Sequence, residues 1–199
     1  MEQSFEQAKI VVQDATRAHE DDIRSFSHRT HDVHHAGLPH RFGPDDSYKT
    51  ALIDLAFDPI KARKKGLGCL IRVACRDPEI LGYVMVIWTL EKDETSAGIA
   101  DIGTFKAGRG LAVGALLLAD LKDQMQQRGW HSLTSNVWQN NAPSHRLFRS
   151  ADFQVEMTEY RFGTPPPLSQ KPVKKTRRSA AMLVALVFLI VSVFFAYWG

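Results

Sequence analysis

The stretch Ile102-Gly-Thr-Phe-Lys-Ala-Gly-Arg109-Gly-Leu-Ala112-Val-Gly114 decides the fold of this chain. It runs from an extended segment through a turn of small residues into a predicted helix, Val113–Arg128, whose apolar side chains recur at helical spacing. A turn of this kind presents consecutive backbone N–H groups and a helix N-terminus, which together bind phosphate groups. The sequence therefore predicts an α/β fold with an anion-binding turn beside Arg109.

A second informative element follows this helix. The extended stretch Leu133–Trp138 leads into Asn141-Ala-Pro-Ser144-His-Arg-Leu-Phe148-Arg-Ser-Ala-Asp152-Phe153, with a predicted helix over Ser144–Ser150. Asn141 either caps this helix or contacts a ligand. The first helix should turn one apolar stripe toward the core, made of Val113, Leu116, Leu117, Leu121 and Met125.

The rest of the domain supplies further strands and helices. Before the turn, we expect a strand over Lys9–Asp14, a helix over Arg17–Ser27 capped by Thr16, and a loop and helix region to about Lys65. Three further strands are expected over Cys69–Arg76, Ile80–Leu90 and Gly98–Phe105, and a last extended segment over Gln154–Phe162.

The two cysteines, Cys69 and Cys75, would lie about 20 Å apart on one strand, too far for a disulfide. Two buried thiols in a reducing compartment are the expected state.

The turn and the second element together resemble the GNAT superfamily of acyl-CoA-dependent N-acyltransferases. In that family the turn reads Arg/Gln-x-x-Gly-x-Gly/Ala, and the second element reads Asn-x-x-Ala-x-x-x-Tyr-x-x-x-Gly-Phe. The resemblance covers the coenzyme-binding half of the fold. It implies a mixed, mostly antiparallel central sheet flanked by helices, acetyl-CoA as co-substrate, and direct attack of a bound primary amine on the thioester.

The resemblance also implies site residues. Asp101, eight residues before Arg109, would be the general base, the alternative being a structural aspartate at a strand edge. Backbone amides near Ile102–Thr104 would polarise the thioester carbonyl. The coenzyme would contact Ile102, Gly103, Thr104, Arg109, Gly110, Leu111, Ala112, Val113, Gly114, Asn141, Ser144, Phe148 and Arg149, with Arg146 and Arg149 both candidates for its 3′-phosphate.

The chain departs from the family pattern at Ala112, Phe148 and Asp152, which replace Gly, Tyr and Gly. Phe148 cannot donate a proton to the leaving thiolate, so water, Tyr160 or His145 would have to do so. If position 112 needs a positive φ, the methyl group weakens phosphate binding. These departures support a second interpretation, a degenerate domain that binds acyl-CoA as a membrane-tethered sensor or scaffold without turnover. Transfer of a longer acyl group is a third.

Histidines gather in the first helical region, which borders the acceptor pocket in the family: His19, His28, His31, His34, His35 and His40. The spacing of His31 and His35 suits a metal on one helix face, but no carboxylate–His signature surrounds them, so we predict no metal site.

Two local details resemble the diamine and polyamine acetyltransferase branch. They are the segment Asn141–Ser144 and the strand from Ile80, which is followed by the acidic turn Glu91–Glu94.

Charge and hydropathy divide the chain. Five of the 25 Lys and Arg residues follow Phe162, where no acidic residue occurs, so residues 1–161 carry a net charge of −2 and show no nucleic-acid footprint. Ala180–Trp198 holds 19 residues without a charge, and as a helix would rise about 28 Å, close to a bilayer's hydrocarbon core. The basic cluster Lys174–Arg178 precedes it, which favours a cytoplasmic domain.

We therefore expect a single-pass C-tail anchor with the catalytic domain in the cytoplasm, a hydrophobic dimerisation helix being the alternative. The expected organisation is a GNAT domain over residues 1–162, a Pro-rich and basic linker over 163–179 and a transmembrane helix over 180–198. The expected partners are a small-molecule or protein amine acceptor at or near the membrane, the membrane itself, and a second copy of the chain in a homodimer.

Removal of residues 163–199 should release the protein from membranes and leave acetyl-CoA binding unchanged, because the tail contains no residue of the predicted site. Membrane fractionation and calorimetric titration measure the two properties. A truncated protein that has lost coenzyme binding would show that the tail is more than an anchor.

Overall fold

The computed structural model describes residues 9–37, 45–90 and 96–156. Their strands form one sheet in the order β1-β2-β3-β4-β5, with bounds Val11–Asp14, Leu67–Arg76, Glu79–Thr89, Ser96–Thr104 and Ser132–Ser135. The first three pairings are antiparallel, and β4 pairs with β5 in parallel. The prediction of a mixed, mostly antiparallel central sheet is confirmed.

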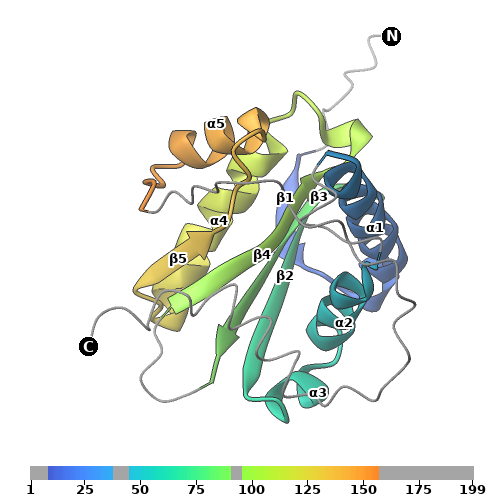
Figure 1. Ribbon diagram of the computed structural model, residues 1–199, viewed down its shortest axis with the longest axis vertical. Coiled ribbons are helices and arrows are strands. Elements are labelled where there is room, and N and C mark those ends of the chain that lie inside the picture. The colour runs from blue at the N-terminus through green and yellow to red at the C-terminus, as the bar shows by residue number, and fades with distance from the viewer. Residues whose placement is uncertain (1–8, 38–44, 91–95, 157–199) are drawn as a thin grey trace, which may run out of the picture.

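Helices cover both faces of the sheet (Figure 1). The α-helices are α1, α2, α3, α4 and α5, with bounds Glu20–Gly37, Ser47–Ala56, Pro59–Arg63, Val113–Arg128 and Ala142–Ser150, and two 3-10 turns occupy Arg17–His19 and Lys106–Gly108. One face carries α4 and α5, and the other carries α1, α2 and α3. The sheet therefore separates the predicted phosphate-binding turn, which precedes α4, from the histidine-rich α1.

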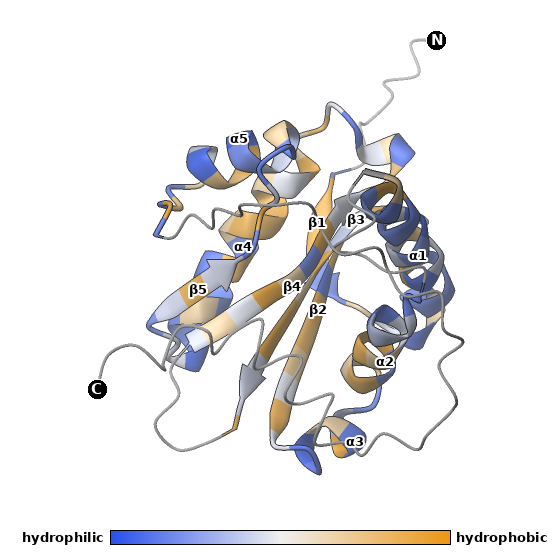
Figure 2. Cartoon of the chain, viewed as in Figure 1, coloured by the Kyte–Doolittle hydropathy of each residue, from blue (hydrophilic) through white to orange (hydrophobic). Residues whose placement is uncertain are grey.

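Side chains alternate between the two faces along the central strands, as the pleat of a strand requires. On β3, Val84 and Val86 enter the core beneath α4, whereas Tyr83 and Met85 enter the core beneath α1 and α2. Because β2 and β3 are covered on both sides, they read as nearly continuous apolar runs, and Figure 2 shows them among the hydrophobic parts of the molecule.

The predicted helix Val113–Arg128 is confirmed at both ends, but its core stripe is partly wrong. Leu116 is 40% exposed, and Leu118 is buried in its place. The helix is covered by the sheet and by α5, so its buried stripe is shifted by part of a turn relative to the prediction.

The first predicted helix is also corrected. Thr16 precedes a 3-10 turn, and α1 then continues to Gly37, ten residues beyond the predicted end at Ser27. No Gly or Pro occurs in α1 before Gly37, so nothing in the local sequence ends the helix earlier. Strand β5 ends at Ser135, three residues short of the predicted Trp138.

The predicted linker 163–179 and transmembrane helix 180–198 lie outside the described residues, as does most of the last expected segment, Gln154–Phe162. Among the helices of residues 9–37, 45–90 and 96–156, none has both the length and the apolar character needed to cross a bilayer.

In the same residues, Cys69 and Cys75 are free thiols, and burial raises the pKa of Cys69 to about 12.

A β-bulge in β4 opens the sheet where the predicted site lies. Val86 faces Ile99 and Met85 faces Asp101, so Ala100 is an extra residue in β4. The pairing of β4 with β5 ends at Ile99, immediately before the bulge. Within the described residues, the stretch 101–104 therefore has β3 along one edge and no strand along the other.

An ion-pair cluster fixes α4 on the sheet. Arg72 of β2 donates from Nε and Nη2 to the two carboxylate oxygens of Asp120 on α4, at 2.8 and 2.7 Å, and from Nη1 to Asp14 of β1 at 2.6 Å. The side chains of Arg72 and Asp120 are only 13% and 17% exposed. This two-point contact sets the position of the helix whose first turn follows the phosphate-binding turn.

Replacing Arg72 with Met should lower the free energy of unfolding by about 2–3 kcal/mol, because Asp120 is left as a largely buried charge without its partner. Denaturant unfolding followed by circular dichroism measures the change. Arg76→Met is the matched control: the Arg76–Glu79 pair is solvent-exposed and should contribute less than about 1 kcal/mol. Equal losses in the two variants would contradict a clamping role for Arg72.

Candidate functional site

The turn between β4 and α4 contains two residues in the left-handed conformation. Gly110 has a φ of 78°, and Ala112, the N-cap residue of α4, has a φ of 54°. A left-handed conformation costs a residue with a side chain about 1–2 kcal/mol. Ala112 therefore keeps the geometry for which the family pattern uses glycine, at the cost of local strain.

A cavity of about 310 Å³ lies over this turn, lined by Thr104, Gly108, Arg109, Gly110, Ala112, Val113, Gly114, Ala115 and Leu147. No side chain caps the N-terminus of α4. The first-turn N–H groups and the positive end of the helix dipole are therefore available to an anion in this cavity. Arg109, which is exposed, adds a guanidinium group.

A second cavity, of about 200 Å³, continues from the first along β4. It is lined by Ile102, Gly103, Thr104, Pro143, Ser144 and Leu147, and the two cavities share Thr104 and Leu147. Leu147 can lie there because Gly114 has no side chain: a Cβ at Gly114 would come within 2.9 Å of a Leu147 methyl group. Together the cavities follow the unpaired edge of β4 to the start of α5.

The backbone groups at this edge can be assigned from the strand's alternation. The amide of Phe105 donates to the carbonyl of Leu81 on β3 at 2.8 Å. Alternate residues of a strand point to alternate edges, so Gly103 also faces β3, and the amides of Ile102 and Thr104 point away from it. These two N–H groups face the edge along which the second cavity runs.

The α5 residues divide between the site and the core. Asn141 caps α5 by accepting a hydrogen bond from the Ser144 amide at 3.2 Å, and its predicted contact with the coenzyme stays a prediction. Phe148 is 6% exposed and packs edge-on against Phe153, with ring centroids 5.0 Å apart. Phe148 belongs to the core and does not line either cavity, so its predicted contact with the coenzyme has no support in the geometry.

The structure thus brings together most of the predicted coenzyme residues. Those at the cavities are Ile102, Gly103, Thr104, Arg109, Gly110, Ala112, Val113, Gly114 and Ser144. Leu111, Arg146 and Arg149 are exposed residues outside both linings. The sequence reasoning missed Leu147, which helical spacing from Ser144 would have placed on the cavity side of α5.

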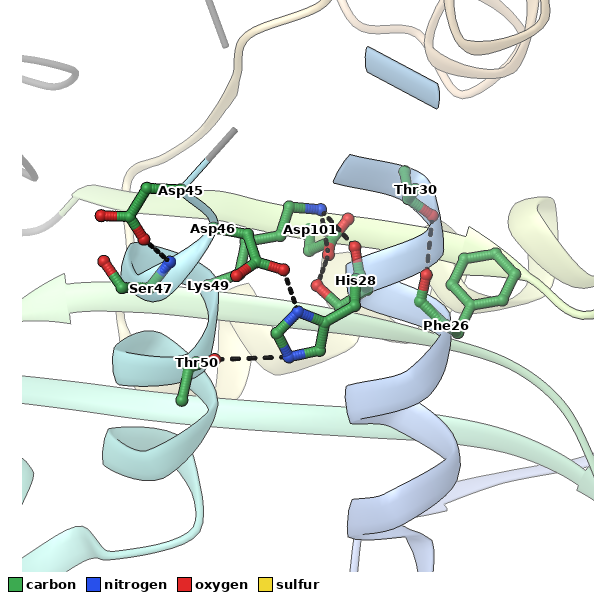
Figure 3. A network of polar contacts seen from close by, with 10 residues as sticks. Phe26, His28, Thr30, Asp45, Asp46, Ser47, Lys49, Thr50 and Asp101 are labelled. Atoms are coloured by element: carbon green, nitrogen blue, oxygen red, sulfur yellow. Dashed lines mark hydrogen bonds and ion pairs between the residues drawn. The ribbon is translucent and has the colours of Figure 1, made fainter. Parts of the chain in front are cut away.

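Asp101 lies on the opposite face of the sheet, in a polar cluster beneath α1 and α2 (Figure 3). Its Oδ2 atom accepts hydrogen bonds from the hydroxyls of Ser27 and Tyr83, both at 2.8 Å, and lies 3.4 Å from the Lys49 ammonium group. Lys49 also donates to the Ser27 carbonyl at 3.0 Å. Asp101 is therefore the centre of a buried network, and Ser27, Lys49 and Tyr83 are members that the sequence reasoning missed.

The tyrosines of this cluster are neutral at physiological pH. Burial raises the pKa of Tyr83 well above its usual value, and the charge of Asp101 raises it further. Burial, followed by the charges of Asp101 and Asp46, raises the pKa of Tyr48 to about 12. Both hydroxyls can therefore donate hydrogen bonds, and neither adds a charge to the cluster.

The histidines of α1 border this cluster. His31 is buried and its ring lies 5.7 Å from that of Tyr48, and His28 lies between Asp46 and Thr50 of the α2 segment (Figure 3). Within the described residues, no group of three or more His, Cys, Asp or Glu side chains is arranged to hold a metal ion. Histidine here serves the contact between α1 and α2 and the surroundings of Asp101.

Residues 28–153 match the family described as the acetyltransferase (GNAT) family. No curated protein sequence matches this chain.

Solved structures with a similar fold include the following three. The YycN protein of Bacillus subtilis has a TM-score of 0.60 and 17% identity, covering 78% of this chain and 100% of that one. The PaiA N-acetyltransferase of Thermoplasma acidophilum, solved with coenzyme A, has a TM-score of 0.55 and 15% identity, covering 76% of this chain and 93% of that one. AAC(6')-Iy, solved with the bisubstrate analogue CoA-S-monomethyl-acetylneamine, has a TM-score of 0.53 and 13% identity, covering 78% of this chain and 98% of that one. At these identities the similarity concerns the fold alone.

Ala112→Gly should stabilise the protein by about 0.5–1 kcal/mol, because removal of the left-handed strain outweighs the extra backbone entropy of glycine in the unfolded chain. Denaturant unfolding measures this change. Ala119→Gly, at an exposed position inside α4, should destabilise by about 1 kcal/mol. Destabilisation by Ala112→Gly as well would show that position 112 is not strained.

Proposed function

Because the chain belongs to the acetyltransferase (GNAT) family, we propose that it transfers an acetyl group from acetyl-CoA to a primary amine by direct attack of the amine on the thioester. The observation that carries this proposal is the unpaired edge of β4. It joins an uncapped helix N-terminus on one side to the buried Asp101 cluster on the other.

The two cavities suit the two ends of the coenzyme. The pyrophosphate would bind at the uncapped N-terminus of α4, beside Arg109. The pantetheine arm would lie along β4 as an added strand, hydrogen-bonded to the outward N–H groups of Ile102 and Thr104. A fixed amide at this edge would stabilise the negative charge that develops on the thioester oxygen. The PaiA and AAC(6')-Iy structures, with coenzyme A and a coenzyme A conjugate, support acetyl-CoA as the co-substrate.

The acceptor would approach from the α1 and α2 side, where Asp101 lies two residues before the cavity residue Gly103 on the same face of β4. Asp101 would accept the proton that the amine loses, directly or through water. Thr104 and Ser144 line the second cavity, and their hydroxyls would donate a hydrogen bond to the leaving thiolate. Phe148 has no part in this step.

A binding domain without turnover is the second candidate. The strained Ala112 and the buried Phe148 favour it, since the first weakens the phosphate turn and the second removes the tyrosine of the family pattern. The two candidates differ in one property: a sensor or scaffold would bind the coenzyme and release no free thiol with any amine.

We also propose that residues 180–198 anchor this domain to a membrane, with the catalytic domain in the cytoplasm and the acceptor at or near the lipid surface. The support is the uncharged apolar run and the basic cluster that precedes it. Amines of membrane proteins and lipid-linked amines are the acceptors that such an anchor would favour.

Calorimetric titration of acetyl-CoA and assay of free thiol release with a panel of amines test the proposal together. Arg109→Ala should weaken coenzyme binding about tenfold, whereas Asp101→Asn should leave binding unchanged and lower turnover by about 100-fold or more. Arg63→Ala, at an exposed position of α3, is the control and should change neither. Binding without any thiol release would favour the sensor, and a folded protein that does not bind acetyl-CoA would contradict both candidates.

A further inference from the structure

The buried polar side chains of this protein gather in one place. Within the described residues, the polar or charged side chains that are buried are Ser27, His31 and Lys49. Ser27 and Lys49 contact Asp101 directly, and His31 packs on Tyr48, the residue before Lys49. Buried polar groups reduce stability unless they are paired, so a paired cluster of them around the candidate base Asp101 is a candidate functional site.

The charges in the cluster are already balanced before an acceptor arrives. The Lys49 ammonium and the Asp101 carboxylate are 3.4 Å apart, with side chains only 9% and 12% exposed. Two hydroxyl groups also donate to the same carboxylate oxygen. An incoming ammonium group would therefore meet a carboxylate that is already paired, with the Lys49 ammonium group beside it.

The other charged groups around Asp101 do not change this balance. On α2, Asp46 is paired with His28 of α1, and contact with that histidine lowers the pKa of Asp46. The two nearby tyrosines, Tyr48 and Tyr83, are neutral. Lys49 and Asp101 are thus the pair that determines the local field.

The side chain of His34 is influenced by both charges of this pair. Its pKa is lowered, first by burial, then by the positive charge of Lys49, and also by His31. The charge of Asp101 acts in the opposite direction and does not reverse the shift. A basic nitrogen at this place is therefore favoured in its neutral form.

We propose that the acceptor site selects amines that are weakly basic, and so neutral when they bind, and that Lys49 enforces this selection by repelling ammonium groups. The inference rests on the proposed function and names its substrate class. Terminal α-amino groups, with an ordinary pKa of about 8, belong to this class, whereas lysine side chains, at about 10.4, do not. Diamines and polyamines, suggested by the local resemblance of Asn141–Ser144, are strongly basic alkylamines and fall outside it.

The chemistry balances without a further reactant. The lone pair of the neutral amine attacks the thioester carbon, the C–N bond forms, and the C–S bond breaks to release the coenzyme thiolate. The amine nitrogen loses one proton to Asp101, the thiolate takes one proton from water, and the hydroxide left behind recovers the proton from Asp101. A protonated amine would first have to lose an additional proton beside the Lys49 cation, which the cluster disfavours.

A matched pair of probes tests the inference on the full chain saturated with coenzyme A. At pH 8.5 butylamine is still an ammonium ion, whereas 2,2-difluorobutylamine has nearly the same shape and is largely neutral, because fluorine withdraws electrons from the amine. Fluorine NMR measures binding of the difluoro probe and its displacement by butylamine. The assay needs no turnover, so its result is read separately from the thiol release that tests the proposed function.

In the unchanged protein the difluoro probe should bind at least about tenfold more tightly than butylamine, because an ammonium group would lose its hydration beside Lys49 and find Asp101 already paired. Lys49→Gln should remove most of this difference, and Lys49→Arg should preserve it. Lys64→Gln, on the exposed surface, is the matched control and should leave it unchanged. Because each comparison is a ratio of two probes on one sample, partial loss of folded protein does not affect it.

Three results would overturn the inference. They are tighter binding of butylamine than of the difluoro probe, a difference that persists in Lys49→Gln, and absence of binding by both probes. Thiol release with weakly basic amines, together with one of these results, would leave the proposed transfer standing and remove only the selection by Lys49.

Discussion

The bulge at Ala100 is the constraint on which the site depends. One extra residue in β4 coincides with the end of its pairing to β5, so the following residues keep β3 as a neighbour and leave their other edge to a ligand. Exposed strand edges usually invite pairing with another chain. Here the edge lies between the N-terminal ends of α4 and α5, where an extended, amide-bearing molecule can complete the sheet and a phosphate can meet an uncapped helix.

The same strand separates the two halves of the site. Ile102 and Thr104 turn their side chains toward α4 and α5, whereas Asp101 and Gly103 face α1 and α2, so the coenzyme and the acceptor meet across a single strand. The supporting contacts are correspondingly divided. Arg72 fixes α4 from β2 and β1, and the buried Lys49–Asp101 pair joins α2 to β4. Each half is thus positioned by its own charged contact to a rigid sheet.

Local signals in the sequence were sufficient for the turn and for α4. The helix ends where Gly129 takes a left-handed conformation, and such a residue can be recognised without tertiary information. The Asp101 cluster could not be found in this way, because Lys49 and Ser27 lie 52 and 74 residues before Asp101 in the chain. These residues meet only when α1 and α2 pack on the sheet. Phe148 illustrates the same limit: the motif indicated its position on α5, but only the packing against Phe153 shows that it faces the core.

The most direct test of this account is a titration of the isotope-labelled protein with acetyl-CoA, followed through the backbone amide resonances of β4. If the coenzyme lies along the open edge, the amides of Ile102 and Thr104 should shift strongly and gain protection from hydrogen exchange, whereas those of Gly103 and Phe105, which face β3, should change little. Saturable binding that leaves Ile102 and Thr104 unaffected would show that the coenzyme binds elsewhere and would contradict the account.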